Sequence, residues 1–308
     1  MTTLLDKIKE YINNVAYNVK EVFSLNDDLD KINLDEIIES EYKKAFESLH
    51  KFGIIEYIES KYGTIKNNYK IKYMKPKLEI LEDPSSPNGE YEMWENKIII
   101  SKKSIKKLID KKLESLGYNE IEGSISDIQY IEYSNSSYNL KFLYPFYINK
   151  NEKNIRKSIS RAIIRSIMLH EFWHSIDFNI LYRPLRVFIV LGGLTNLDDF
   201  ELRASAFEVV MYYLVNGLHK DERGYMAAYD NIPMCRKYIE EIDKLEKDGI
   251  SVPYDLGFCY GNIIVAKYKS SLEENIHNII DDIIRLDKER AIEVIKNYVY
   301  NPDKLLHD

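Results

Sequence analysis

The spacing of apolar residues predicts helices at the start of the chain. Through residues 3–60, apolar positions such as Ile8 and Ile12 recur every three or four residues, which is the period of an amphipathic helix. Gly53 interrupts this pattern, and because glycine is a weak helix former we expect the helix to break there. The pattern therefore indicates an N-terminal helical segment over residues 1–65.

The period of the pattern changes near residue 68. Apolar and polar residues alternate in YKIKYM and PKLEILED, which is typical of strands, and NKIIIS is typical of a buried strand. A lysine-rich helix is predicted over residues 102–116, and two further strands are predicted within residues 127–148 around a polar turn. These strands predict a β-sheet in the middle of the chain.

The remaining segments are predicted to be turns or helices. DPSSPNGEYEMW contains two prolines and an Asn-Gly pair and is interpreted as a turn. Helical periodicity returns over residues 152–215 and again over residues 218–308. In the last of these regions, one proline and two glycines within residues 253–261 are interpreted as interruptions between helices.

Composition narrows the class of protein. The chain has 308 residues, of which 45% are hydrophobic, and its net charge of −7 and lack of a long basic run argue against nucleic-acid binding. Its N-terminus lacks the apolar core of a signal peptide, and its most apolar stretch, residues 184–194, is too short to cross a membrane. We expect a soluble, cytoplasmic protein that binds neither nucleic acid nor membrane, and its oligomeric state stays open. Cys235 and Cys259 form no CxxC pair and are expected to be free, partly buried thiols.

The motif HEFWH carries the candidate chemistry. It follows an apolar helical stripe that ends at Ile167, and His170 and His174 continue that stripe. Residues four apart share one face of a helix, so both imidazoles can reach one metal ion. Glu171 points about 100° around the helix and can face a water molecule without binding the metal. Two core histidines are the alternative, but the motif and its helical context favour a zinc site.

A third ligand is expected downstream, because catalytic zinc generally takes three protein ligands. The predicted helix in NLDDFELRASAFEVV places Glu201, Ala204, Phe207 and Glu208 along one side. HExxH followed by ExxAxxF resembles the gluzincin-type zinc metallopeptidases. The fuller strings HEFWHSID and ELRASAF are similar to the catalytic domain of the anthrax lethal factor-like peptidases, over about residues 150–215.

The resemblance implies a role for each matching residue. His170, His174 and Glu201 would bind Zn²⁺, and Glu171 would be the catalytic base. The alanine and phenylalanine of the second motif would pack that helix against the first. Glu208 is the alternative third ligand, because it lies seven residues after Glu201.

The resemblance also implies a fold and a division of the chain. We expect an α+β protein, in which a zincin-like catalytic domain combines a mixed β-sheet with an active-site helix. The α/β upper lobe would cover residues 66–180 and end in the HExxH helix. A mainly helical lower lobe over residues 181–308 would supply the third ligand, and the N-terminal helices would precede both.

Two features around the ligands remain open. Asp177 shares a face with the histidines, and metal-bound histidines usually donate their second N–H to a carboxylate or carbonyl. We expect Asp177 to support them, with Arg203 as a candidate partner; an ordinary acid at a helix end is the alternative. The similar peptidases carry a tyrosine before the third-ligand helix, and VLGGLTNLDDF has none. Candidates to stabilise the transition state are then Arg203, Tyr212, Tyr254 and Tyr260.

These residues predict a zinc-dependent metallopeptidase. Zinc would activate a water molecule and polarise the substrate carbonyl, and Glu171 would move the proton from that water to the leaving amine. A peptide or protein substrate would lie along an exposed strand, supplied by NKIIIS or LKFLYPFYI. The alternative is a zinc-binding protein of the same fold with a regulatory or binding role and little or no proteolysis. In that case the terminal helices could cover the cleft.

Overall fold

The computed structural model describes most of the chain, and the statements below concern that part. The described residues are 33–65, 69–83, 88–115, 128–135, 140–147, 155–181, 197–247 and 253–307. Helices make up most of this part, with short strands between them, so the fold is broadly α+β as the sequence predicts. The helix expected around Ile8 and Ile12 lies outside the described residues. No helix in the described part is long and apolar enough to span a membrane.

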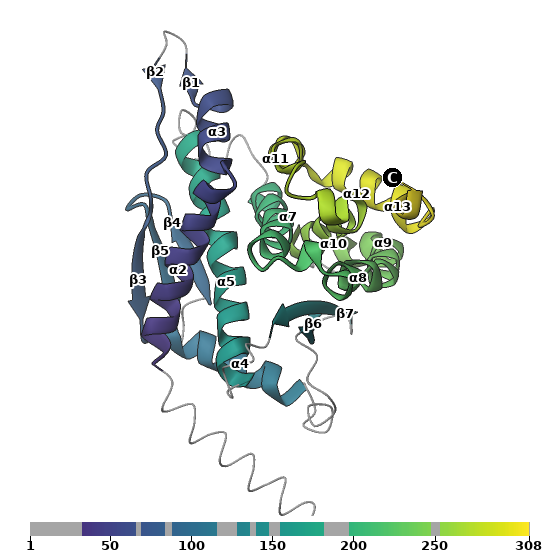
Figure 1. Ribbon diagram of the computed structural model, residues 1–308, viewed down its shortest axis with the longest axis horizontal. Coiled ribbons are helices and arrows are strands. Elements are labelled where there is room, and N and C mark those ends of the chain that lie inside the picture. Colours follow the sequence, from purple (N-terminus) through teal and green to yellow (C-terminus); the bar gives the residue numbers. More distant parts are fainter. Residues whose placement is uncertain are drawn as a thin grey trace, which may run out of the picture.

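Helix α5 (Ile155–Ile176) lies at the centre of the molecule (Figure 1). Helix α2 (Leu34–Lys51) and a small sheet pack on one side of it, and α7 (Leu197–Val215) packs on the other. After α5 the chain continues into a π-helical turn, η2 (Asp177–Leu181). Because α5 contains the HExxH motif, elements from both halves of the chain surround the candidate site.

The N-terminal helices are fixed to α5 by a buried ion pair. Asn33 caps α2, and the chain breaks at Gly53, whose φ of 64° favours glycine, before α3 (Ile54–Tyr62) begins. The predicted break at Gly53 is therefore confirmed. The carboxylate of Glu41, which is fully buried in α2, accepts a hydrogen bond of 2.6 Å from Arg165 of α5. Lys44 at 3.1 Å and Arg161 at 3.9 Å also pair with this carboxylate, so Glu41 is the shared acid of a cluster that ties α2 to the motif helix.

A three-stranded mixed sheet packs against α5 and α2. Its strands are β3 (Lys77–Leu81), β4 (Gly89–Glu92) and β5 (Lys97–Ser101), in the order β3-β5-β4. Strand β5 runs parallel to β3 and antiparallel to β4. The prediction that NKIIIS offers a free edge was wrong, because β5 is paired on both sides. Strand β4 was not predicted. It has only four residues, and the two prolines and the Asn-Gly pair at its start led to the interpretation of this segment as a turn.

The other strands form two separate pairs. Strands β1 (Thr64–Ile65) and β2 (Tyr69–Lys70) pair antiparallel, and so do β6 (Ile128–Asn135) and β7 (Leu140–Tyr147). The second pair and α4 (Lys102–Ser115) match the predicted elements. The strand predicted from YKIKYM ends at Lys70. Its continuation instead bonds to α3 and the residue after it, since Ile71 N donates to the Gly63 carbonyl and Tyr73 N to the Glu59 carboxylate.

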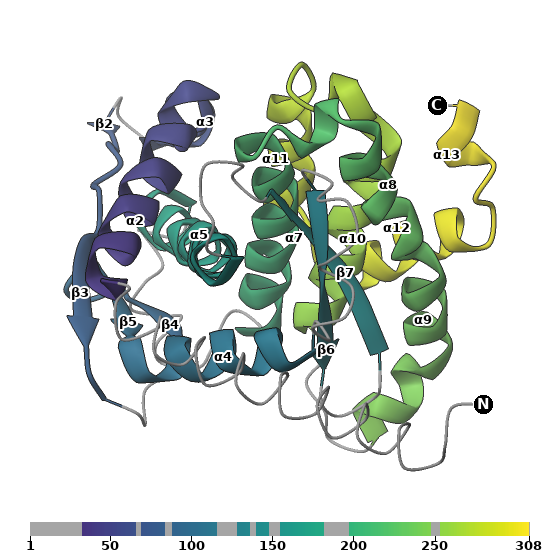
Figure 2. The ribbon, with the colours of Figure 1, turned by 60° about the horizontal axis from the view of Figure 1, so that its bottom comes forward.

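The C-terminal part is helical, as predicted. Its elements are η4 (Leu218–Lys220), α8 (Glu222–Asp230), α9 (Ile232–Lys247), α10 (Pro253–Tyr268), η5 (Lys269–Ser271), α11 (Ile276–Ile284), α12 (Lys288–Val299) and α13 (Lys304–His307). The interruptions predicted at the two glycines of α10 were wrong. A Cβ on Gly257 would lie 2.3 Å from the Leu202 carbonyl oxygen, and one on Gly261 would lie 2.7 Å from Val209 Cβ. The glycines therefore let α10 pack closely on α7, beside which it lies in Figure 2.

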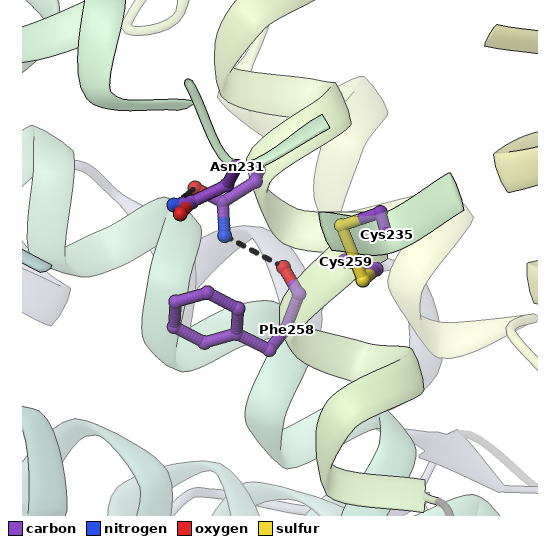
Figure 3. The surroundings of a disulfide bond; sticks show 5 residues. Asn231, Cys235, Phe258 and Cys259 are labelled. Carbon is purple, nitrogen blue, oxygen red and sulfur yellow. Dashed lines mark hydrogen bonds between the residues drawn. A yellow bond between two sulfur atoms is a disulfide. The ribbon is translucent and has the colours of Figure 1, made fainter. Parts of the chain in front are cut away.

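Cys235 of α9 and Cys259 of α10 form a disulfide (Figure 3). Their Cα atoms are 5.4 Å apart and both side chains are fully buried. The prediction of free, partly buried thiols was wrong. Pairing requires contact between two helices, and the spacing of two cysteines in a sequence does not reveal such a contact.

Reduction of this disulfide is expected to lower the free energy of unfolding by about 3 kcal/mol, because the crosslink closes a loop of 24 residues. Urea denaturation with and without a dithiol reductant measures the change, and the Cys235→Ser, Cys259→Ser double variant should match the reduced protein. Alkylation of unreduced, denatured protein should label neither thiol. Labelling of both would show that the disulfide does not form.

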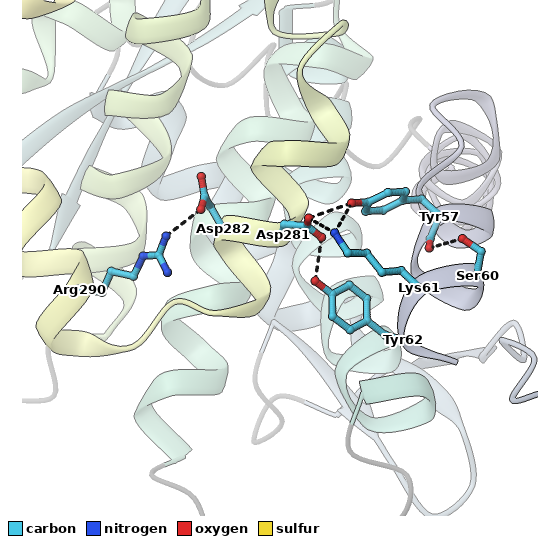
Figure 4. A network of polar contacts seen from close by, with 7 residues as sticks. All are labelled: Tyr57, Ser60, Lys61, Tyr62, Asp281, Asp282 and Arg290. Atoms are coloured by element: carbon cyan, nitrogen blue, oxygen red, sulfur yellow. Dashed lines mark hydrogen bonds and ion pairs between the residues drawn. The ribbon is translucent and has the colours of Figure 1, made fainter. Parts of the chain in front are cut away.

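A polar cluster joins the N-terminal helices to the C-terminal helices (Figure 4). The carboxylate of Asp281 in α11 accepts hydrogen bonds of 2.9 Å from Tyr57 and 2.8 Å from Tyr62, and it also pairs with Lys61. The ring of Tyr57 stacks on His277 at 4.3 Å. These contacts connect α3, near the start of the described chain, to α11, near its end.

Candidate metal centre

Three predicted ligands come together between α5 and α7. The Nε2 atoms of His170 and His174 lie 3.2 Å apart. The carboxylate Oε2 of Glu201 lies 3.1 Å from the first and 3.3 Å from the second. Both histidines are buried and Glu201 is partly exposed, so the cluster could hold a metal ion on the side where Glu201 reaches solvent.

The spacing of the three donor atoms fits a small tetrahedral cation. Ligand bonds of about 2.0–2.1 Å place the donors of a tetrahedral ion about 3.3–3.4 Å from one another. The observed separations of 3.1–3.3 Å are close to this value. Two imidazoles and one carboxylate are a donor set of catalytic zinc sites, although such donors also suit other divalent metals.

Packing between the two helices fixes the position of Glu201. Phe207 of α7 lies against Trp173 of α5 with a centroid separation of 4.5 Å, and both side chains are fully buried. Ala204 is also fully buried. The contact of Phe207 with Trp173 packs α7 against α5, and Glu201, nearly two turns before Phe207, lies at the ligand cluster.

Glu208 lies on the opposite side of His170 from the ligand cluster. One of its carboxylate oxygens is 3.2 Å from Nδ1 of His170, and the other accepts a hydrogen bond from the Ser166 hydroxyl. Glu208 therefore lies where it orients His170, and Glu201 lies where a third ligand is needed. The sequence offers Glu208 only as an alternative third ligand, although its spacing of seven residues from Glu201 places both on one face of α7.

Glu171 lies beside strand β4, on the side that pairs with no other strand among the described residues. Its carboxylate accepts a hydrogen bond from the main-chain N–H of Tyr91. A Cβ on Gly89 would lie 3.3 Å from Glu171 Oε1 and 2.4 Å from a methyl group of Ile167. Only glycine therefore allows this close approach of β4 to α5. Burial raises the pKa of Glu171, and the neighbouring histidines partly offset that effect.

Asp177 faces an arginine of α7. Its Oδ2 accepts a hydrogen bond of 3.3 Å from Arg203, and both side chains are buried. Arg203 also donates to the carbonyl oxygen of Leu286 at 3.5 Å. Nδ1 of His174 has no hydrogen-bond partner among the described residues, so Asp177 is not bonded to it there. Asp177 connects the η2 turn to α7, and burial raises its pKa.

Of the four candidates to stabilise a transition state, one lies against a predicted ligand. The ring of Tyr254 stacks on His170 with a centroid separation of 5.8 Å and an interplanar angle of 16°. Arg203 is engaged with Asp177. Tyr212 and Tyr260 are buried, and the nearby charges include those of Arg165 for the first and of Asp282 for the second.

The affinity of the cluster for zinc is expected to rise with pH. Burial disfavours the protonated ring of His170, but hydrogen bonds with Glu201 and Glu208 outweigh it and raise the pKa of His170 to about 10. At neutral pH a metal ion must then displace one proton from this ring, so affinity should rise about tenfold per pH unit below that pKa. Competition with a chelator of known pH dependence at pH 6.5, 7.5 and 8.5 measures this slope. A constant affinity would contradict it.

No family model matches the chain, and neither curated proteins nor solved structures give a significant match. The support for a metal centre is therefore the two short motifs and the geometry that brings their residues together. That geometry involves two helices and one strand edge from separate parts of the chain.

Proposed function

We propose that the chain is a zinc-dependent metallopeptidase with a zincin-like fold of the gluzincin type. The observation that carries this proposal is the convergence of His170, His174 and Glu201, with the Glu171 carboxylate beside them at the edge of β4. A purely structural metal site has no need of a second carboxylate that does not bind the metal. Motifs similar to those of the lethal factor-like peptidases support the same proposal.

Glu171 would act as the general base. When bound, zinc would act as a Lewis acid that lowers the pKa of water and polarises the substrate carbonyl. Glu171 accepts the proton that the attacking water loses and passes it to the amine that leaves, so its carboxylate is regenerated at the end of the cycle. The Tyr91 N–H holds this carboxylate in place, and its burial excludes competing solvent.

The substrate would be a peptide, or an extended segment of a protein, that pairs with strand β4. One side of β4 pairs with β5, and the Tyr91 N–H on its other side points toward Glu171. No other described strand pairs with this side of β4, and an extended chain that hydrogen-bonds there would carry its peptide bonds past the ligand cluster. In this proposal strand β4 would take the role for which the sequence suggested NKIIIS or LKFLYPFYI.

Incubation of the zinc-loaded chain with a library of unstructured peptides tests this proposal. Mass spectrometry should detect cleavage that a chelator abolishes and added zinc restores. If the chain holds zinc but cleaves no peptide, the peptidase proposal fails. The regulatory or binding role of a zinc protein would then replace it.

The cytoplasmic location stays a prediction. Disulfides are rare in the reducing cytosol, so the buried pair of Cys235 and Cys259 argues for an oxidising compartment instead. Fractionation of the producing cells, with detection by an antibody, decides between the two locations.

A further inference from the structure

The π-helical turn η2 lies between strand β4 and the helix that carries the third predicted ligand. It follows α5 directly. The ring of its Phe178 stacks on Phe200 of α7 with a centroid separation of 5.0 Å, and Phe200 immediately precedes Glu201. The same Phe178 ring stacks on Tyr91 of β4 at 6.1 Å. Single π-helical turns are frequent at functional sites, and this one contacts both sides of the candidate centre.

Asn179 of η2 holds the side chain of Tyr91 through a triangle of hydrogen bonds. Its Nδ2 donates to the Tyr91 hydroxyl at 2.9 Å and to Oδ1 of Asn96 at 2.9 Å. The hydroxyl in turn donates to the same oxygen of Asn96 at 2.9 Å. Asn179 and Tyr91 are only 2% and 9% exposed, so the bond between them is shielded from water. Because a buried polar group without a partner is costly, the Tyr91 hydroxyl is strongly bound at this place.

The third corner of this triangle is itself fixed. Asn96 lies in the turn between β4 and β5 with a φ of 50°, a left-handed conformation that asparagine tolerates better than most residues. Its Nδ2 donates to the main-chain carbonyls of Met74 at 3.2 Å and Lys75 at 3.4 Å. Its own carbonyl accepts a hydrogen bond of 2.8 Å from Lys77 N, at the start of β3. Asn179 therefore bonds to a turn that the neighbouring chain holds in place.

Tyr91 connects this triangle to the proposed base. Its main-chain N–H donates to the Glu171 carboxylate, while its hydroxyl bonds to Asn179. A shift of the side chain would move the main chain of the same residue, and with it the side of β4 on which the substrate would lie. A misplacement of about 1 Å, caused far from the chemistry, can cost about 10²-fold in rate. The hydrogen bonds of Asn179 can thus affect the reaction through Tyr91.

We propose that Asn179 is a positioning residue for peptide hydrolysis. Through the hydroxyl of Tyr91 it sets the distance between the main chain of β4, where the substrate would pair, and the Glu171 carboxylate. No covalent bond of Asn179 forms or breaks in the reaction. This inference rests on the proposed peptidase function. It requires a loss of kcat with zinc still bound, a result that a merely structural hydrogen bond would not give.

Replacement of Asn179 by alanine tests the proposal. Asn179→Ala should lower kcat by about 10–100-fold, with a smaller rise in KM and an unchanged affinity for zinc. Asn231→Ala is the matched control, because Asn231 is also a buried asparagine whose Nδ2 bonds to a buried amide, that of Asn262, at 2.9 Å. It should reduce stability and leave kcat unaltered. If Asn179→Ala keeps the wild-type kcat and only unfolds more easily, its role is structural and the proposal is overturned.

A second variant removes the same contact with less risk to the fold. Tyr91→Phe keeps the ring and the main-chain N–H and deletes only the hydroxyl. Its kcat should fall as well. The double variant with Asn179→Ala should be no slower than Asn179→Ala alone, because the effects of two residues that act through one contact do not add. Additive losses, or an unchanged kcat in Tyr91→Phe, would overturn the proposal.

A further readout does not depend on peptide cleavage. Amide hydrogen exchange, followed by NMR, reports how often the Tyr91 N–H leaves its hydrogen bond to Glu171. Exchange of this proton should be roughly tenfold faster in Asn179→Ala, and Asn231→Ala should leave it unchanged. Equal rates in Asn179→Ala and the wild type would overturn the proposal. If the wild type cleaves no peptide, the peptidase proposal fails, and this exchange rate still shows whether Asn179 positions β4.

Discussion

Replacement of Glu171 by glutamine is expected to remove peptide hydrolysis while zinc stays bound. Glutamine has nearly the shape of glutamate, and its carbonyl oxygen can still accept the hydrogen bond from the Tyr91 N–H. It cannot accept the proton of the attacking water. A positioned general base contributes about 10²–10⁴-fold, so kcat should fall by that factor. Cleavage of a peptide found in the library experiment measures the change.

The control is the same substitution, glutamate to glutamine, at a position far from the candidate site in the sequence. Glu293→Gln makes the same change of charge at an exposed position of α12 and should leave both kcat and zinc content unaltered. Zinc analysis of Glu171→Gln shows whether the site survives. If Glu171→Gln retained more than half of the wild-type kcat, another group would have to be the base.

Replacement of Glu201 is expected to weaken zinc binding far more than replacement of Glu208. Glu201 Oε2 lies 3.1 Å from His170 Nε2 and 3.3 Å from His174 Nε2, so Glu201→Gln removes a charged donor from the cluster itself. Glu208 touches Nδ1 of His170 and only orients that ring. Loss of such a supporting partner typically costs about 10–100-fold in metal affinity. Glu208→Gln should fall in this range, and Glu201→Gln should exceed it.

Competition with a chelator at one fixed pH compares the two variants. Ser166→Ala provides a graded third point, because Ser166 donates a hydrogen bond to Glu208 and is not itself a predicted ligand. Its effect on zinc affinity should be smaller than that of Glu208→Gln. A larger loss in Glu208→Gln than in Glu201→Gln would move the third ligand about two turns along α7 and contradict the assignment.

Local patterns in the sequence predict the elements that carry the centre. The apolar period before His170 predicts α5, and a spacing of four residues places His174 on the same face. Glu201 was found by its motif on a second amphipathic helix, and the structure places it at the two histidines. The inferences about α5 concern residues within one helix, where geometry follows directly from spacing, whereas the meeting of Glu201 with the histidines was expected from the resemblance of the two motifs.

The features that were missed depend on contacts between distant elements. Gly257 resembles a helix breaker in the sequence, but inside α10 its missing Cβ makes room for the Leu202 carbonyl of α7. Gly89 belongs to a short strand that fits against α5, yet it follows a segment rich in turn residues. Glu208 and Tyr254 meet His170 only after α7 and α10 have packed. The spacing of apolar residues within one element does not predict contacts between different elements.

The metal content of the purified protein tests the central claim most directly. Protein prepared without chelator, or loaded and then dialysed, should contain about one zinc ion per chain by elemental analysis. Glu171→Gln should hold the same amount, and His174→Ala should lose it. If the wild type binds no zinc and takes up none on titration, His170, His174 and Glu201 do not form a zinc site.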